Sequence, residues 1–348
     1  MKRLIYSLIV AASILLPMSV FASHNFITNV HKEFDVNRGC TFEILNRNGN
    51  ITIENTFDDH ITIDAYIVGK ARSTSESEKI CSKIQVSIEM ADNKVTAKSE
   101  IPSSLKPSDF ELNYVVVMPS YLDLNLMNKY GNVTIGELLG KTSVKVSYGT
   151  LKIDRIDDKT NSFPVIDLAY SRQSSIGEIN VGGINMSYSD IAVGRGHAIA
   201  VSSKYSSLSI DKTASAAIES GYDNINIGSV VKLDLSTKYS KVGIDNVMTM
   251  SRIDLSYGSL AISDIDDGFS NIDVSTKYAN VDIGIGKASS CTLDLKVKYG
   301  EINYPKPISD IKYESTPTYK SLAGKYGNPS DNKIIKVRTQ YGNISIDN

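Results

Sequence analysis

The stretch Leu122–Ile135, LDLNLMNKYGNVTI, contains the pattern that decides the fold. An alternating apolar run leads to Tyr130, two small or polar residues follow, and a second alternating apolar run ends the stretch. The pattern returns ten times, at intervals of 17 to 22 residues and finally of 42. The eleven tyrosines are Tyr130, Tyr148, Tyr170, Tyr188, Tyr205, Tyr222, Tyr239, Tyr257, Tyr278, Tyr299 and Tyr341. A period near 20 residues is typical of a stacked repeat architecture.

The apolar positions around each tyrosine predict two strands per repeat. The residue four before the tyrosine is apolar in all eleven repeats, and the residues three and five after it are apolar in ten, with Tyr304 counted as apolar. In the Tyr170 repeat, Ser174 and Ile176 come one residue late. A spacing of two indicates strands. The parity changes after the tyrosine, so we expect a corner there, where small residues such as Gly131 fit.

A unit of about 20 residues is too short for a pair of helices. The sequence therefore predicts an all-β fold, with a single-stranded parallel β-helix over residues 119–348. The tyrosines share the parity of the apolar run before them, so we expect a buried, stacked ladder at one corner. An exposed platform of aromatic rings for sugars is the alternative that this parity disfavours, and the chain has no tryptophan.

Residues 1–22 have the features of a secretory signal peptide. Lys2 and Arg3 precede the apolar run Leu4–Leu16, and Val20-Phe21-Ala22 is a small-x-small cleavage site. A membrane anchor is the alternative, but Pro17 closes the run short of a span. No other stretch is long and apolar enough to cross a membrane, so we expect an exported protein of the periplasm or cell surface.

The charge of the chain limits the classes of partner that it could bind, and the positions of the cysteines indicate their roles. The chain has 37 basic and 39 acidic residues. It is too acidic, without a basic patch, to suggest nucleic acid. Cys40 and Cys81 lie in the N-terminal part, and in an oxidising compartment we expect them to form a disulfide. Cys291 has inward parity and is expected to be a small core residue.

Residues 23–118 differ from the repeats, and we expect them to form a cap that shields the first repeat. NRNGNITI, residues 47–54, fits the repeat template with Asn48 in the tyrosine position. Residues 61–65 alternate as a strand, residues 73–83 predict a short helix capped by Ser73 or Thr74, and residues 86–97 predict a hairpin. Residues 112–118 predict a further strand that leads into the repeats.

Three stretches together resemble the adhesin-like β-helix family, whose members are labelled auto-transporter adhesins with a head GIN domain. They are SESEKICSKIQVSIEMADNKVTAKSEI, ELNYVVVMPSYLDLNLMNKYGNVTI and the repeated SYG and KYG corners. The resemblance covers almost the whole chain after residue 22, and its motifs are structural rather than catalytic. It implies a right-handed β-helix in a secreted or envelope-associated bacterial protein. It carries over no functional residues.

The segment 305–332 departs from the repeat pattern because it contains Pro305, Pro307, Pro317 and Pro329. Tyr326-Gly327 imitates the corner motif, but Pro329 and Asp331 stand where apolar residues are needed. We expect an excursion over the open end of the stack, after which residues 335–346 add the last strands.

No catalytic, cofactor or metal site is expected. His24, His31, His60 and His197 are scattered without metal-ligand spacing, and no phosphate-binding or nucleophile motif is present. Asp154, Asp211, Asp245 and Asp347 follow the second strand of their repeats and share that position with glycines, which indicates a turn rather than a cation site.

One sheet face gathers charge on its outward positions. In neighbouring repeats Asp273 and Asp294 are expected to lie roughly 5 Å apart, the spacing between strands. Such a pair could serve a polysaccharide lyase or hydrolase, whereas the plainer interpretation is a solvated face with mixed charges. We therefore expect a non-catalytic envelope protein, an adhesin-like scaffold with an unidentified surface partner, and keep a carbohydrate-active enzyme as the alternative.

Overall fold

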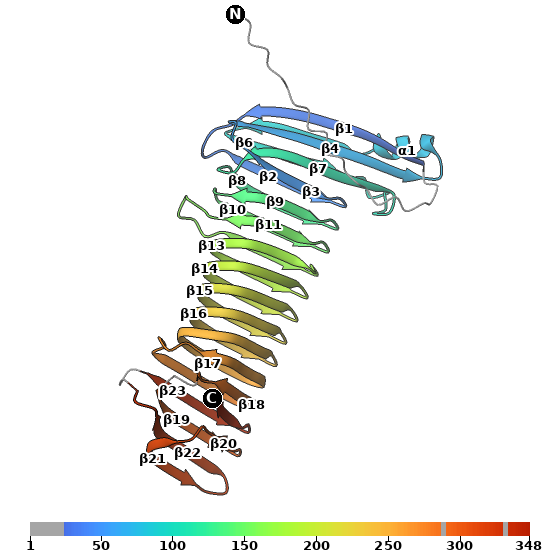
Figure 1. The fold of residues 1–348 in the computed structure, drawn as a ribbon. Coiled ribbons are helices and arrows are strands. Elements are labelled where there is room, and N and C mark those ends of the chain that lie inside the picture. The colour runs from blue at the N-terminus through green and yellow to red at the C-terminus, as the bar shows by residue number, and fades with distance from the viewer. Residues whose placement is uncertain (1–23, 287–289, 330–332) are drawn as a thin grey trace, which may run out of the picture.

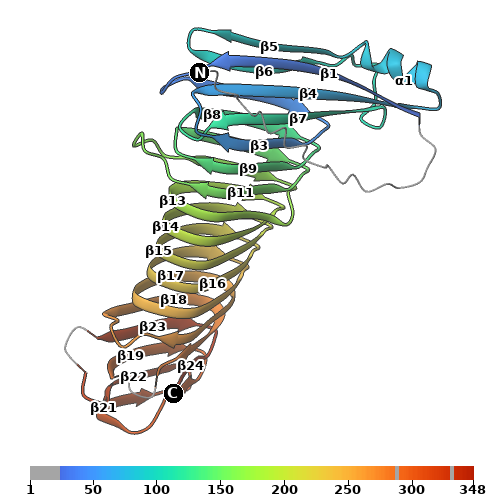
Figure 2. The ribbon, with the colours of Figure 1, turned by 45° about the horizontal axis from the view of Figure 1, so that its top comes forward.

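The computed structural model describes residues 24–286, 290–329 and 333–348, so the predicted signal peptide lies outside the described residues. Within them the protein is all-β apart from one α-helix, and its 24 strands belong to a single sheet. Figure 1 shows the strands stacked in rows from the N-terminal part to the C-terminal part, and Figure 2 shows the same stack tilted. No helix in the described part of the chain is long and apolar enough to span a membrane.

The N-terminal elements are longer and partly antiparallel. They are β1 (His24–Asp35), β2 (Thr41–Arg47), β3 (Ile51–Thr56), β4 (His60–Ala71), α1 (Thr74–Cys81), β5 (Gln85–Ala91), β6 (Lys94–Glu100) and β7 (Phe110–Pro119). β4 pairs in antiparallel fashion with β1 and β7, and β5 pairs so with β6. The predicted helix, hairpin and strands are confirmed. Ser73 caps α1 by accepting a hydrogen bond from the Glu76 amide, which satisfies a free donor of the first turn.

The NRNGNITI stretch of the N-terminal part fits the repeat template, and its strands lie beside those of the first repeat. β2 pairs in parallel with β8 (Asp123–Lys129), and β3 pairs in parallel with β9 (Val133–Leu138). Asn48 takes the tyrosine position with φ 67°. Asparagine tolerates this left-handed conformation better than most residues, and its Nδ2 also donates to the carbonyl oxygens of Pro107 and Phe110.

The remaining strands continue this pattern. They are β10 (Thr142–Ser147), β11 (Leu151–Ile156), β12 (Val165–Ala169), β13 (Ser174–Ser187), β14 (Asp190–Lys204), β15 (Ser207–Gly221), β16 (Asn224–Lys238), β17 (Lys241–Ile265), β18 (Asn271–Gly284), β19 (Cys291–Lys298), β20 (Ile302–Asn303), β21 (Ile308–Ser315), β22 (Tyr319–Tyr326), β23 (Ile334–Gln340) and β24 (Ile344–Asp347). From β13 to β17, successive strands pair in parallel with equivalent residues in register.

The core lies between the two strands of each repeat. The apolar residue four before every tyrosine is at most 4% exposed, as Leu126 and Val337 illustrate. The apolar residues three and five after the tyrosine are buried too, except for half-buried Tyr304. In the Tyr170 repeat, the extra residue is absorbed at Gln173, whose φ is 56°, and Ile176 aligns with Val193 of the next repeat. The predicted inward positions are confirmed.

The C-terminal strands are not added in chain order, which corrects the expectation for residues 335–346. β23 lies between β18 and β19 and pairs in parallel with both. β24 likewise lies beside both β18 and β20. β21 and β22 form an antiparallel hairpin, and β22 pairs with the other edge of β19. β21 and β22 are therefore an excursion that covers the outer edge of β19, and β23 takes an inner position.

The expected Cys40–Cys81 disulfide is wrong. All three cysteines are free and buried. Cys40 directly precedes β2, whereas Cys81 ends α1 and its Sγ faces the carbonyl oxygens of Phe26 and Ile67. The two cysteines therefore belong to different packing environments, and their position in one sequence segment did not bring their side chains together. Cys291 is a core residue, as expected.

Candidate functional site

The eleven tyrosines form one continuous stack, which we call the tyrosine ridge. Neighbouring ring centroids are 4.7–5.0 Å apart and the ring planes are within 25° of parallel. Tyr341 lies between Tyr278 and Tyr299 because β23 lies between β18 and β19. The predicted stacking in register at one corner is confirmed. Ten such intervals give a ridge roughly 50 Å long, set by the strand spacing.

The ridge is exposed, which corrects the expectation of a buried ladder. Each tyrosine is 37–52% exposed. The physical reason is the backbone: all eleven tyrosines have φ between 51° and 62°. A residue in this left-handed region reverses the alternation of the strand, so the side chain points outward although its parity with the preceding run is inward. The corner therefore lies at the tyrosine, not after it.

The residue after each tyrosine takes the inward place. Ser171, Ser189, Ser206, Asp223 and Ser240 are all buried there. The amide of each of the first four donates to the side-chain oxygen of the next, over 2.7–3.2 Å. These bonds satisfy amide groups that face inward at the corner.

Glycine occupies the same inward place in other repeats because backbones approach closely there. A Cβ added to Gly131 would lie 1.9 Å from the carbonyl oxygen of Gly49, and one added to Gly149 would lie 1.9 Å from that of Gly131. Such contacts exclude any side chain. The small corner residues predicted from the sequence are thus confirmed, with close backbone packing as their cause.

The stacking decides what the ridge can contact. Each inner ring has both faces covered by its neighbours, so it exposes only its edge and its hydroxyl. Within the described residues, no hydrogen bond joins any of these hydroxyls to another protein group. Sugar-binding platforms use the faces of aromatic rings, and the faces of the inner rings are not free here. Near the first ring, the Lys129 Nζ lies 4.8 Å from the Tyr130 centroid, a cation–π contact. The ridge instead presents a row of hydroxyls and ring edges.

Asp273 and Asp294 do not form the pair that an acid-based enzyme would need. In the strand register, Lys336 of β23 lies between them. Its Nζ is 3.5 Å from an oxygen of Asp273, while Arg338 and Lys296 contact Asp294 at 3.0 and 3.4 Å. The expected spacing of one strand is therefore wrong, because β23 separates the two carboxylates. Acidic and basic side chains contact one another on this face, as the plainer interpretation predicted.

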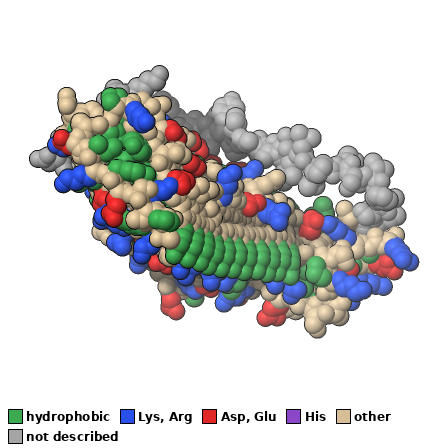
Figure 3. Space-filling model, turned by 90° about the horizontal axis from the view of Figure 1, so that it is seen from below, with side chains coloured by type: hydrophobic (Ala, Val, Ile, Leu, Met, Phe, Trp, Pro, Cys, Tyr) green, Lys and Arg blue, Asp and Glu red, His purple; other side chains and the backbone are tan. Residues whose placement is uncertain are grey.

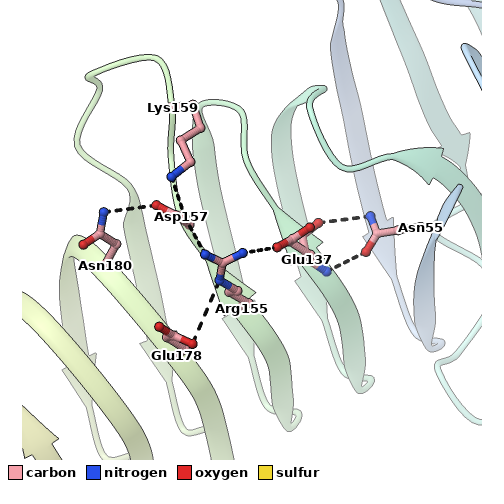
Figure 4. A network of polar contacts seen from close by, with 7 residues as sticks. All are labelled: Asn55, Glu137, Arg155, Asp157, Lys159, Glu178 and Asn180. Atoms are coloured by element: carbon pink, nitrogen blue, oxygen red, sulfur yellow. Dashed lines mark hydrogen bonds and ion pairs between the residues drawn. The ribbon is translucent and has the colours of Figure 1, made fainter. Parts of the chain in front are cut away.

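A second polar network, around Arg155, was not predicted from the sequence (Figure 4). Arg155 contacts Glu137 of the preceding repeat and Glu178 of the following one. It also lies 2.6 Å from Asp157. The carboxylate and guanidinium groups come from equivalent positions of stacked repeats, so the network ties three repeats together. Only the strand register brings these positions side by side, and the sequence offered no local signal.

Asp157 is the buried member of this network. It is 4% exposed and accepts from Lys159 at 2.6 Å and from Asn180 at 3.0 Å. The Lys159 ammonium, the Asn180 amide and Arg155 together lower the pKa of the Asp157 carboxyl, against the opposing effect of burial. A carboxylate whose partners are all protein groups stabilises the structure and is not available to act as a catalytic acid or base.

The acidic residues that were expected in a turn lie inside strands. They are Asp154 in β11, Asp211 in β15, Asp245 in β17 and Asp347 in β24, and all four are exposed. At Asp154 the parallel pairing skips one position, passing from Ile153–Ile176 to Arg155–Glu178. In the part of the chain that the structure describes, no group of His, Cys, Asp or Glu side chains could hold a metal ion.

The chain matches no family model, and no curated protein matches it. It is similar to several solved structures. One is a proposed cell adhesion protein from Clostridium sporogenes, with 10% identity, a TM-score of 0.19, and coverage of 92% of this chain and 99% of that one. Another is a proposed lipid-binding protein from Parabacteroides distasonis, with 9% identity, a TM-score of 0.34 and coverage of 92% and 97%. A third is a proposed adhesin from Bacteroides fragilis, with 10% identity, a TM-score of 0.24 and coverage of 92% and 97%.

Proposed function

We propose that this chain is an exported, non-catalytic protein of the bacterial envelope that serves as an adhesin-like interaction scaffold, with the tyrosine ridge as its contact surface. The proposal includes a single-stranded parallel β-helix over residues 119–348, capped by residues 23–118. The parallel register of equivalent residues in successive repeats supports the β-helix. The features of residues 1–22 support export.

The observation that carries the proposal is the exposure of eleven stacked tyrosines on one line. Large contiguous exposed patches of apolar side chains mark interaction sites in soluble proteins. Figure 3 shows an uninterrupted green band on this face of the molecule. The rings are held by stacking and by a backbone paired on both sides, so little conformational entropy is lost when a partner binds.

The backbone strain at the ridge supports the same conclusion. A left-handed residue with a side chain costs roughly 1–2 kcal/mol relative to the right-handed region. The protein uses this conformation at all eleven tyrosines of the ridge, although glycine would adopt it without cost. Mutual stacking offsets part of the cost, and outward presentation of the rings explains why an aromatic residue is kept where burial does not require one.

The enzyme alternative loses its main support in the structure. Its acid pair, Asp273 and Asp294, is separated by Lys336 and neutralised by cations. An acid pair must face one substrate bond, and here Lys336 stands between the two carboxylates. We therefore favour a binding role.

The test replaces Tyr188, Tyr222 and Tyr257 with asparagine, the residue that occupies the equivalent place at Asn48. Asparagine tolerates the left-handed backbone, so the variant keeps the corner and loses the ridge. Sedimentation with purified envelope fractions should show strong loss of binding. A control variant, Ser209→Asn/Lys241→Asn/Ser259→Asn, changes outward positions of the other strand and should bind as the parent does.

Equal binding of the ridge variant and the parent would overturn the proposal, provided that circular dichroism shows both folded. Incubation of the parent with purified envelope glycans tests the alternative. Release of oligosaccharides that is abolished by Asp273→Asn/Asp294→Asn would favour the enzyme.

A further inference from the structure

A row of residues runs beside the tyrosine ridge, one position before each tyrosine. In the strand register its C-terminal part reads Lys204, Gly221, Lys238, Ser256, Lys277, Gln340 and Lys298. A lysine therefore occurs in every second repeat over seven repeats. We call Lys204, Lys238, Lys277 and Lys298 the lysine row.

The insertion of β23 creates this regular spacing. In chain order Lys277 and Lys298 belong to consecutive tyrosine repeats, Tyr278 and Tyr299, and adjacent strands would have placed them side by side. Gln340 lies between them instead. Successive lysines of the row are thus two ring intervals of 4.7–4.9 Å apart, which is roughly 10 Å.

The four lysines are exposed, and the Lys277 Nζ lies 5.5 Å from the centroid of the Tyr278 ring. No carboxylate occupies this row in any repeat, and within the described residues none of the four forms an ion pair. Other sheet lysines do: Lys336 contacts Asp273, and Lys296 contacts Asp294. The row is a line of positive charge on a chain whose formal net charge is −2. In Figure 3, blue side chains follow the border of the green band.

The exposed ring edges of the ridge carry the same sign. An aromatic ring has a negative face and a positive edge. Stacking hides the faces and leaves the positive edges outward, together with hydroxyl groups that can donate hydrogen bonds. The ridge and the lysine row thus form one surface that favours anions, repeats along one axis and offers a hydroxyl every 4.7–5.0 Å.

We propose that this surface binds a linear acidic polysaccharide lying along the stack, with its anionic groups on the lysine row and its sugar hydroxyls on the tyrosine hydroxyls. The inference rests on the proposed function and names the partner class of the same ridge. A polysaccharide fits better than a single-stranded nucleic acid, because bases bind by stacking on free aromatic faces. A linear polymer fits because the surface is straight and repetitive.

The experiment measures binding of polygalacturonate, whose every sugar carries a carboxylate, at low and at physiological salt. Fully methyl-esterified polygalacturonate has the same backbone without the charge. Two variants are compared with the parent. One is Lys204→Gln/Lys238→Gln/Lys277→Gln/Lys298→Gln, which copies the glutamine already present at 340. The matched control, Lys152→Gln/Lys212→Gln/Lys232→Gln/Lys241→Gln, removes equal charge from exposed lysines outside the row.

The parent should bind polygalacturonate, and added salt should weaken the binding because the charges are exposed. The lysine-row variant should lose about tenfold or more, since four surface charge contacts are removed. The control variant should stay within about twofold, and the methyl ester should bind weakly. Equal losses in both variants, or equal binding of the ester, would overturn the inference.

Envelope sedimentation keeps this inference separate from the proposed function. If the lysine-row variant binds envelopes as the parent does and the tyrosine variant does not, the ridge is a contact surface for another class of partner. If the tyrosine variant also binds normally, the proposed function itself fails. Binding of polyglutamate or single-stranded DNA as tightly as polygalacturonate would show that the surface reads charge alone, and would overturn the assignment to a polysaccharide.

Discussion

The Nζ of Lys336 lies 3.5 Å from an Asp273 carboxylate oxygen, although 63 residues of chain separate the two. This ion pair lies where β23 is inserted between β18 and β19, out of chain order. Without β23, Asp273 and Asp294 would face each other across neighbouring strands, and like charges directly opposite are destabilising. Lys336 and Arg338 bring the complementary charges. The carboxylates therefore favour insertion of β23 over direct pairing of β18 with β19.

Reversing the charges on β23 should test whether charge favours its insertion between β18 and β19. Lys336→Glu/Arg338→Glu is expected to lower the free energy of unfolding by about 1–2 kcal/mol, because half-exposed ion pairs are each worth up to about 1 kcal/mol and repulsion replaces them. Urea denaturation measures the change. Lys241→Glu, on an exposed lysine without a carboxylate partner among the described residues, should cost much less. Equal losses in both variants would contradict a role of charge in strand order.

The tyrosine ridge should contribute stability through stacking rather than through its hydroxyls. Tyr239→Phe should be nearly neutral, because the hydroxyl has no protein partner within the described residues. Tyr239→Asn should cost about 1–3 kcal/mol, because two ring contacts of about 0.5–1.5 kcal/mol each are lost while the left-handed φ of 57° is tolerated. Thermal unfolding of the three proteins tests this. A Phe variant as unstable as the Asn variant would show that the hydroxyl matters.

The repeat and its strands could be predicted from the sequence because they follow from local periodicity. Alternation of apolar residues marked the inward positions, and they are buried in the structure. The outward direction of the tyrosines could not be read in this way. It depends on a left-handed backbone at Tyr130 and its equivalents, and a parity count assumes extended backbone throughout.

The order of the strands in the last repeats could not be predicted from the sequence, for a different reason. The 21-residue interval from Tyr278 to Tyr299 fits direct stacking as well as any other interval. The deciding contacts join β23 to β18 and β19 across long stretches of chain. The Arg155 network has the same character, since Glu137 and Glu178 meet Arg155 only through the strand register.

Thiol labelling should find three free cysteines. Burial raises the pKa of the Cys40 and Cys81 thiols, and it raises that of Cys291 to about 12. Reaction needs the thiolate and access to solvent, so all three should react slowly in the folded protein. Unfolding in urea without reductant should release three reactive thiols. A single reactive thiol under those conditions would instead show that Cys40 and Cys81 form a disulfide.

Asp157 should make the protein less stable in acid. Its pKa in the folded protein lies below the ordinary value of 3.8, mainly because of Lys159. The folded state therefore binds the proton less tightly than the unfolded state does. The stabilisation is present above pH 3.8 and is lost as the pH falls through the folded-state pKa. Urea titrations of the parent and Asp157→Asn from pH 6 to pH 2.5 should converge in acid, and a constant difference would contradict the assignment.

Asp223 should have the opposite pH dependence. It is 5% exposed and stands where Ser206 and Ser240 stand in the neighbouring repeats. Burial raises the pKa of its carboxyl group, although the Ser203 hydroxyl and the Ser206 amide donate to it. The folded state thus binds the proton more tightly than the unfolded state does. The contribution of Asp223 to stability is therefore greatest below pH 3.8, the ordinary value, and falls as the pH rises through the folded-state pKa.

Asp223→Ser removes this charge and keeps an oxygen that can accept from the Ser206 amide, as serine does at the equivalent positions. Ser203 loses its acceptor at every pH, so only the change with pH reports on the carboxyl group. Relative to the parent, the variant should gain stability between acid and neutral pH, because it lacks one poorly solvated charge. Urea denaturation from pH 3 to pH 7 measures that difference. The opposite result is a variant that becomes less stable relative to the parent as the pH rises. It would show that the hydrogen bonds to Asp223 outweigh its burial, because the folded state would then favour the ionised carboxylate.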